Sequence, residues 1–142
     1  MRQRNARHEA IREIVRSRYI HTQRDLVEEL ATRGFVCTQA TISRDISDMG
    51  LRKLTEGVYI LAEDVHLQRI VSDLVLDVVL ANNLVVVKTE TGSAQAVAAA
   101  LDAADLPLLL GSIAGDDTIL IIAQDEERAK AFKAAVNKLK VQ

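Results

Sequence analysis

The stretch TQATISRDISDMG, residues 38–50, gathers short hydroxyl side chains around a single arginine. At about 100° per residue, its apolar positions fall on one side of a helix, at Ile42, Ile46 and Met49. The other side carries Ser43, Arg44 and Ser47, with Thr41 beside them. Short hydrogen-bonding side chains with one cation suit base edges and phosphates in a DNA major groove. The stretch therefore predicts an exposed helix that reads DNA.

A second group of polar residues lies far downstream. Asp116 and Asp117 are adjacent between two apolar runs, at the expected tip of a hairpin. Two carboxylates held there can accept forked hydrogen bonds from a guanidinium group, whereas a divalent metal would find few oxygen ligands. Gln95 and Asp102 lie two helical turns apart, on one face of an alanine-rich helix, and form a candidate polar pair at a subunit interface.

The elements before the exposed helix are predicted to be two further helices. Apolar residues recur at helical spacing over residues 6–18. A second helix is expected from Thr22, a capping residue, to Gly34, and Thr38 is expected to cap a third that ends at Gly50. The chain thus predicts two helices, a short turn and the exposed helix.

The segment LRKLTEGVYIL, residues 51–61, predicts a small hairpin directly after the third helix. Together these elements describe a winged helix-turn-helix, in which the hairpin, or wing, touches the DNA backbone. In that arrangement Arg52 and Lys53 reach phosphates, and the arginines of the first helix extend the positive surface.

The second half of the chain predicts the order ββαββα. Two β-branched runs meet at Asn82-Asn83, an alanine-rich helix follows that Pro107 is expected to stop, and two more strands flank the turn at Asp116-Asp117. A helix with acidic residues first and lysines last closes the chain. The fold class is therefore α+β, an antiparallel sheet with helices on one side following the winged helix-turn-helix.

Charge divides the chain in the same way. Residues 1–62 carry 11 basic and 8 acidic side chains, whereas residues 63–142 carry 7 basic and 12 acidic ones. We expect residues 1–62 to form a DNA-binding domain, residues 63–72 a linker, and residues 73–142 an effector and oligomerisation domain.

Composition excludes several classes of protein. The 142 residues are 49% hydrophobic and 27% charged, which is a globular balance. One cysteine, Cys37, cannot form an internal disulfide, and neither zinc-ligand spacing nor an apolar run of membrane-spanning length is found. We expect a cytoplasmic protein with no metal, no cofactor and no membrane partner.

Residues 22–54, TQRDLVEELATRGFVCTQATISRDISDMGLRKL, resemble the winged helix-turn-helix of bacterial arginine repressors, whose third helix carries a TQATxSRD motif. The resemblance implies operator contacts on double-stranded DNA by four residues of this helix, namely Gln39, Thr41, Ser43 and Arg44.

The resemblance continues through residues 92–122, GSAQAVAAALDAADLPLLLGSIAGDDTILII, which are similar to the C-terminal domain of the same family. It implies that L-arginine acts as corepressor, held between subunits that form trimers and, from two trimers, hexamers. The implied contacts are Gln95, Asp102, Asp116 and Asp117. The expected function is an arginine-dependent repressor of genes for arginine biosynthesis and catabolism.

Three alternatives stay open from the residues alone. One is a regulator with another amino-acid effector, as in leucine-responsive proteins, although their effector domain has a βαββαβ order. Another is a paralogue that no longer senses arginine. The third, a small enzyme using Asp116 and Asp117, lacks a partner nucleophile, because the histidines lie outside the β-rich half, at His8, His21 and His66. We therefore predict that the protein is not an enzyme.

Overall fold

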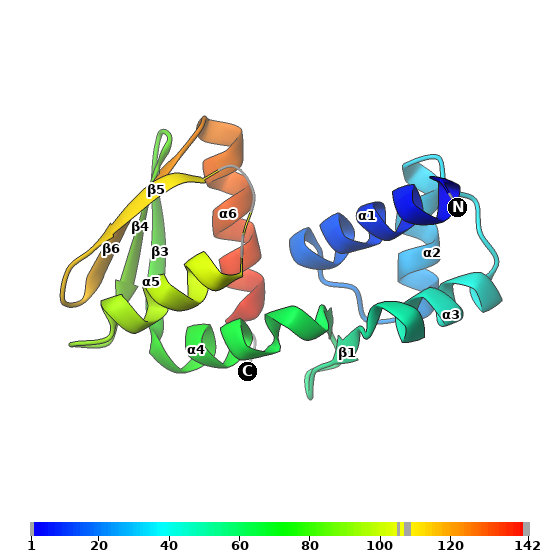
Figure 1. Cartoon of the computed structure of the whole chain (residues 1–142), viewed down its shortest axis with the longest axis horizontal. Coiled ribbons are helices and arrows are strands. Elements are labelled where there is room, and N and C mark those ends of the chain that lie inside the picture. Colours follow the sequence, from blue (N-terminus) through cyan, green and yellow to red (C-terminus); the bar gives the residue numbers. More distant parts are fainter. Residues whose placement is uncertain (1, 105, 107–108, 141–142) are drawn as a thin grey trace. The chain divides into compact units, whose positions relative to one another are not determined.

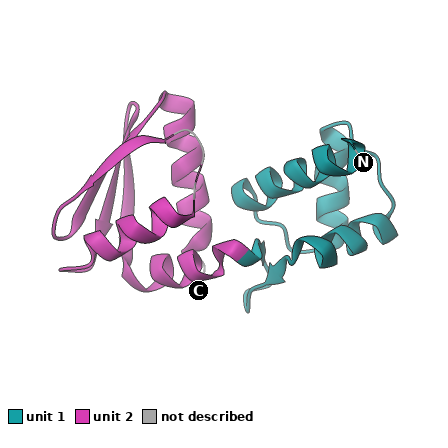
Figure 2. Ribbon diagram, viewed as in Figure 1, with its two compact units in different colours: residues 1–62 teal, residues 63–142 magenta. Residues whose placement is uncertain are grey.

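The chain divides into two compact units, residues 1–62 and residues 63–142 (Figure 2). The computed structural model describes residues 2–104, 106 and 109–140. Pro107, the expected helix stop, lies outside these residues.

Three helices and a two-stranded hairpin build the first unit (Figure 1). Their bounds are Arg2–Ser17 for α1, Gln23–Thr32 for α2, Gln39–Met49 for α3, Arg52–Lys53 for β1 and Tyr59–Ile60 for β2. The strands pair antiparallel, with Arg52 opposite Ile60 and Lys53 opposite Tyr59. The predicted winged helix-turn-helix is confirmed, and its wing is short.

Local sequence sets the ends of α2 and α3. The Thr22 hydroxyl accepts a hydrogen bond from the Asp25 amide, while the Asp25 carboxylate accepts one from the Thr22 amide, so both partners of a capping box are present. Thr38 accepts from the Thr41 amide in the same way at the start of α3. Gly50 ends α3 at φ +66°, a left-handed conformation that glycine adopts without steric cost.

A single apolar core holds the three helices together. It joins α1, α2 and α3 through side chains that are almost completely buried, among them Ile11, Ile14, Leu26, Leu30 and Ile42. Ile46 and Met49 pack against this core but are only partly buried. The predicted inner stripe of α3 is therefore confirmed, and Asp45, which the prediction left out, is also buried.

The second unit contains a four-stranded sheet and three helices. Their bounds are Val65–Leu74 for α4, Val75–Ala81 for β3, Leu84–Thr89 for β4, Ala94–Ala103 for α5, Leu109–Ala114 for β5, Thr118–Ala123 for β6 and Glu126–Leu139 for α6. All neighbouring strands are antiparallel and lie in the order β3-β4-β6-β5. The ββαββα order is confirmed. Asn82, in the turn between β3 and β4, has the positive φ that such a turn requires.

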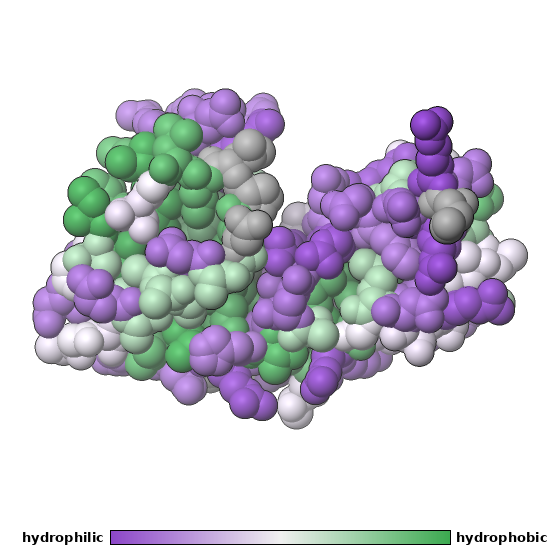
Figure 3. All heavy atoms as spheres, in the orientation of Figure 1, coloured by the Kyte–Doolittle hydropathy of each residue, from purple (hydrophilic) through white to green (hydrophobic). Residues whose placement is uncertain are grey.

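The two faces of this sheet differ in burial. Alternate residues of β4 and β6 are almost completely buried, such as Val85, Val87, Ile119 and Ile121. On the opposite face, a row of four apolar residues crosses the sheet, one from each strand. Val79 pairs with Val86, Val86 with Leu120, and Leu120 with Ile113. Val79 and Ile113 are 45% and 68% exposed. Apolar side chains over β5 are visible in Figure 3. We call Val79, Val86, Leu120 and Ile113 the open-face row.

The segment expected to be a linker, residues 63–72, mostly forms the helix α4, which begins after a 3-10 turn, η1 (Ala62–Asp64). Leu67 and Val71 are buried, and α4 packs against α5, α6 and β3. The apolar side of this amphipathic helix thus packs within the second unit, residues 63–142. Within the described residues, no helix is long and apolar enough to cross a membrane.

Candidate DNA-binding and ligand-binding sites

The outward face of α3 presents most of the predicted DNA contacts to solvent. Gln39, Ser43 and Arg44 are exposed. Thr41 is half-buried, and its hydroxyl lies 3.0 Å from the Thr38 hydroxyl at the helix cap. The capped first turn thus holds Gln39 and Thr41, while Ser43 and Arg44 follow one turn later.

The inward face of α3 carries a charged residue that sequence reasoning missed. Asp45 is 2% exposed, yet it lies in a cluster of polar partners from α1. Arg7 donates two hydrogen bonds to it, from Nε to Oδ2 at 2.5 Å and from an Nη to Oδ1 at 3.0 Å. His8 Nε2 lies 2.9 Å from the same Oδ1. The available signal was an acidic residue within the apolar side of the helical wheel.

The charges in this cluster reinforce one another. Burial raises the pKa of the Asp45 carboxyl, but the hydrogen bonds from Arg7 and His8 outweigh burial and leave that pKa below its ordinary value. The hydrogen bond to Asp45 in turn raises the pKa of the Arg7 guanidinium. The pair is therefore fully ionised at neutral pH.

A second ion pair joins the same two helices one turn away. Arg4 donates to the Asp48 carboxylate at 2.9 Å. Arg4 and Arg7 lie three residues apart, as do Asp45 and Asp48, so each pair shares one helix face. These two arginines of α1, expected to extend the positive surface, instead bind carboxylates of α3.

The wing presents its two basic residues to solvent. Arg52 and Lys53 are both exposed on β1. The Lys53 ammonium lies 5.2 Å from the centre of the Tyr59 ring on β2, within the range of a cation–π contact. This contact limits the freedom of a side chain that was predicted to reach a phosphate.

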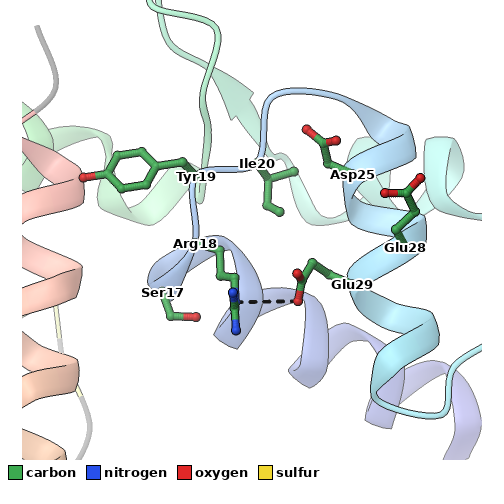
Figure 4. Close-up of a pocket in the computed structure, with 7 residues that line it drawn as sticks. All are labelled: Ser17, Arg18, Tyr19, Ile20, Asp25, Glu28 and Glu29. Carbon is green, nitrogen blue, oxygen red and sulfur yellow. Dashed lines mark ion pairs between the residues drawn. The ribbon is translucent and has the colours of Figure 1, made fainter.

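An acidic hollow lies on another side of the first unit, between the end of α1 and α2. It measures about 450 Å³ and is lined by Asp25, Glu28 and Glu29 together with Ser17, Arg18, Tyr19 and Ile20 (Figure 4). Arg18 pairs with Glu29 at 3.6 Å, as the dashed line shows. A surface with this many carboxylates repels phosphates.

In the second unit, three of the four predicted arginine contacts come together. Gln95, in the first turn of α5, donates from Nε2 to the Ala114 carbonyl at 2.9 Å, at the end of β5. Asp116 and Asp117 follow in the turn between β5 and β6. The carbonyl of Asp116 accepts from the Ala94 amide at 3.1 Å, so this turn also caps α5.

Asp116 and Asp117 each accept one hydrogen bond, through one carboxylate oxygen, from another residue in the described part of the chain. Asp116 Oδ2 accepts from the Gly92 amide at 3.3 Å, and Asp117 Oδ1 accepts from the Thr118 hydroxyl at 3.0 Å. Both side chains are exposed. The second oxygens can therefore accept hydrogen bonds from a cationic ligand.

Asp102 is separate from this cluster. It lies seven residues after Gln95 in α5, roughly 10 Å along the helix axis. There it lines a hollow of about 250 Å³ whose other walls are mostly apolar, including Leu101, Leu106 and Leu110. One subunit thus does not gather all four predicted contacts in one place.

A metal site is not found among the described residues, in which no three histidine, cysteine or acidic side chains are close enough to hold an ion.

Comparison with known families covers both units. Residues 2–67 match the model of the arginine repressor DNA-binding domain, and residues 71–138 match that of the arginine repressor C-terminal domain. The chain is 40% identical to an arginine repressor of Koribacter versatilis over 94% of its length and 96% of the relative's. It is 44% identical to one of Thermus thermophilus, over 89% and 84% of the two lengths. With both domains matched in order and relatives aligned along most of the chain, this protein belongs to the arginine repressor family.

Proposed function

We propose that this protein represses genes of arginine metabolism by binding operator DNA when L-arginine is present. The observation that carries the DNA-binding part is the exposed face of α3, with Ser43 and Arg44 on a domain of the matched DNA-binding family. Gln39 and Thr41 contact the operator from the first turn of the same helix, and Arg52 and Lys53 contact phosphates from the wing. Because chromosomal DNA is the partner, the protein works in the cytoplasm.

The DNA contact is tested by replacing Arg44 with alanine. The probe is a duplex that the wild-type protein selects from a random-sequence pool. Arg44→Ala is expected to weaken operator binding by roughly 5- to 150-fold, which is the usual loss for an arginine that contacts a base. Arg24→Ala is the matched control, since Arg24 is an exposed arginine that pairs with Glu28 on α2. Equal binding by both variants would contradict the assignment.

The second part of the proposal concerns the effector. L-arginine binds through its guanidinium group to Asp116 and Asp117, with Gln95 beside them. Charge-assisted hydrogen bonds with fork geometry favour this pairing. Because Asp102 lies roughly 10 Å from Gln95 in one subunit, the site is completed by Asp102 of another subunit. Arginine therefore favours the assembled state over the separate subunits.

Calorimetry of L-arginine binding tests this site. Asp117→Asn is expected to lower arginine affinity by at least about tenfold, the equivalent of one charged hydrogen bond. Asp73→Asn, at an exposed position of α4, is the control for loss of one negative charge. Undiminished affinity in Asp117→Asn would count against the pocket.

An operator titration with and without L-arginine, at stated salt concentrations, tests the link between effector and DNA. We expect tighter binding with arginine at each salt concentration. Equal affinity in both arms would contradict the corepressor role and leave DNA binding intact.

Assembly is the third part of the proposal. The second unit self-associates, as trimers and as hexamers made of two trimers. The open-face row supports this, because an apolar stripe across a whole sheet is costly to leave in water. Several copies also raise the effective concentration of DNA-binding domains at paired operator sites.

A further inference from the structure

Two ion pairs join α1 to α3, Arg7 with Asp45 and Arg4 with Asp48. α3 joins the core of the first unit through Ile42, which is fully buried, and through Ile46 and Met49, which are partly buried against that core. Apolar contacts of this kind are non-directional, so they fix the depth of a helix more firmly than its rotation. Rotation matters here. A side-chain atom that lies about 5–6 Å from the helix axis is displaced by about 2 Å when the helix rotates by about 20° about its axis. Hydrogen bonds to base edges tolerate a change of only about half an ångström in the donor–acceptor distance.

The ion pair of Arg7 and Asp45, unlike an apolar contact, is directional. The guanidinium holds both carboxylate oxygens in one plane, at 2.5 Å and 3.0 Å, and His8 adds a third contact at 2.9 Å. The side chains of Arg7 and Asp45 are 16% and 3% exposed, so water competes little for these bonds. Asp45 directly follows Ser43 and Arg44 in the chain, and any rotation at Asp45 is transmitted to both.

We propose that Arg7 and Asp45 are positioning residues, which fix the rotation of α3 about its axis and so aim Ser43 and Arg44 at the DNA bases. This inference rests on the proposed contact of Ser43 and Arg44 with the operator. The exposed Arg4–Asp48 pair holds the same two helices one turn away, with a smaller contribution because water screens it.

The alternative is that the pair only stabilises the domain, and a double variant separates the two roles. Arg7→Met/Asp45→Leu replaces a buried ion pair with apolar side chains of similar size, a change that commonly preserves or raises stability. We expect an unfolding midpoint at or above that of the wild type. Affinity for the selected operator should nevertheless fall by at least about tenfold, because base contacts lose their geometry. Affinity for a scrambled duplex should fall by less than about twofold, because phosphate contacts tolerate a small rotation.

Two outcomes would overturn the proposal. Operator affinity within about twofold of the wild type would mean that the pair acts through stability alone. An equal loss on the operator and on scrambled DNA would mean that Arg7 contacts phosphate itself. Arg24→Met/Glu28→Leu is the matched control for loss of an ion pair on the first unit, since Arg24 and Glu28 form an exposed pair on α2.

A conservative variant keeps the test decisive if the double variant does not fold. Arg7→Lys retains the positive charge beside Asp45 but loses the planar fork. We expect folded protein whose operator affinity falls several-fold while scrambled-DNA affinity is unchanged. Unchanged operator affinity would overturn the positioning role.

Arg44→Ala distinguishes this inference from the proposed function on which it rests. If Arg44→Ala weakens operator binding while the double variant binds the operator as tightly as the wild type, only the positioning role is wrong. If Arg44→Ala binds the operator as tightly as the wild type, the assignment of the exposed face of α3 as the DNA-binding surface is wrong.

Discussion

Lys138, in α6, is a lysine whose ammonium group is buried without a hydrogen-bond partner among the described residues. Burial lowers the pKa of this amine from 10.5 to about 8, although the charge of Asp64 opposes the shift. Below pH 8 both the folded and the unfolded chain carry this charge, so folding bears the full cost of burying it. Above pH 10.5 both are neutral and the cost disappears.

Lys138→Met is therefore expected to stabilise the protein at neutral pH by about 3 kcal/mol, since a shift of one pKa unit is worth about 1.4 kcal/mol. The difference from the wild type should shrink as the pH rises from 8 to 10.5, between the folded and unfolded pKa values. Chemical denaturation at several pH values measures this difference in the free energy of unfolding. Lys130→Met, at an exposed position of the same helix, is the control. A difference that does not change with pH would contradict this account.

α3 is a short helix whose two ends are set by its own sequence. Thr38 accepts from the Thr41 amide at 3.2 Å at the start, and Gly50 adopts the left-handed conformation at the end. Such caps matter in a helix of 11 residues, which is too short to be stable alone. The orientation of α3 then comes from Ile42 and from Asp45, both of which pack against other helices.

Removal of the N-cap of α3 should loosen the helix itself. Thr38→Ala is expected to cost about 1 kcal/mol, because the Thr41 amide loses its acceptor. Hydrogen exchange of the α3 amides measures the loss, with protection falling several-fold. Thr38→Ser, which keeps the hydroxyl, should retain the wild-type protection. Equal protection in the alanine variant would show that the cap contributes nothing.

The whole molecule combines a unit with an excess of basic residues and a unit with an excess of acidic ones. The outward face of α3 is exposed on the first unit, and the open-face row lies on the sheet of the second unit. In the proposed function, the first unit binds the nucleic acid, and the second unit binds the effector and further copies of the chain.

Self-association is tested by placing a charge on the open-face row. Ile113→Lys should lower the molar mass found by light scattering, because a lysine cannot be buried in an apolar interface without a large cost. The circular dichroism spectrum should be unchanged, since Ile113 is exposed in the single chain. Val36→Lys, at an exposed apolar position of the first unit, is the control and should keep the wild-type mass. A wild-type mass for Ile113→Lys would place the interface elsewhere.

The sequence by itself determined the features that depend on near neighbours along the chain. The caps at Thr22 and Thr38, the left-handed Gly50 and the inward position of Ile42 all follow from residues within a turn or so. The order ββαββα follows from β-branched runs and turn residues in the same way. The resemblance to arginine repressors rests on motifs of this kind.

Only the tertiary structure decided which distant groups meet. Asp45 finds Arg7 across 38 residues of chain, and no periodicity indicates such a partner. Asp102 shares a helix face with Gln95 but lies seven residues further along α5, whereas the carbonyl of Asp116 accepts a hydrogen bond from Ala94 at the start of that helix. The sequence alone does not show that the apolar side of α4 packs against α5, α6 and β3. Pairing at long range is set by how whole elements pack, and that information is absent from any single segment.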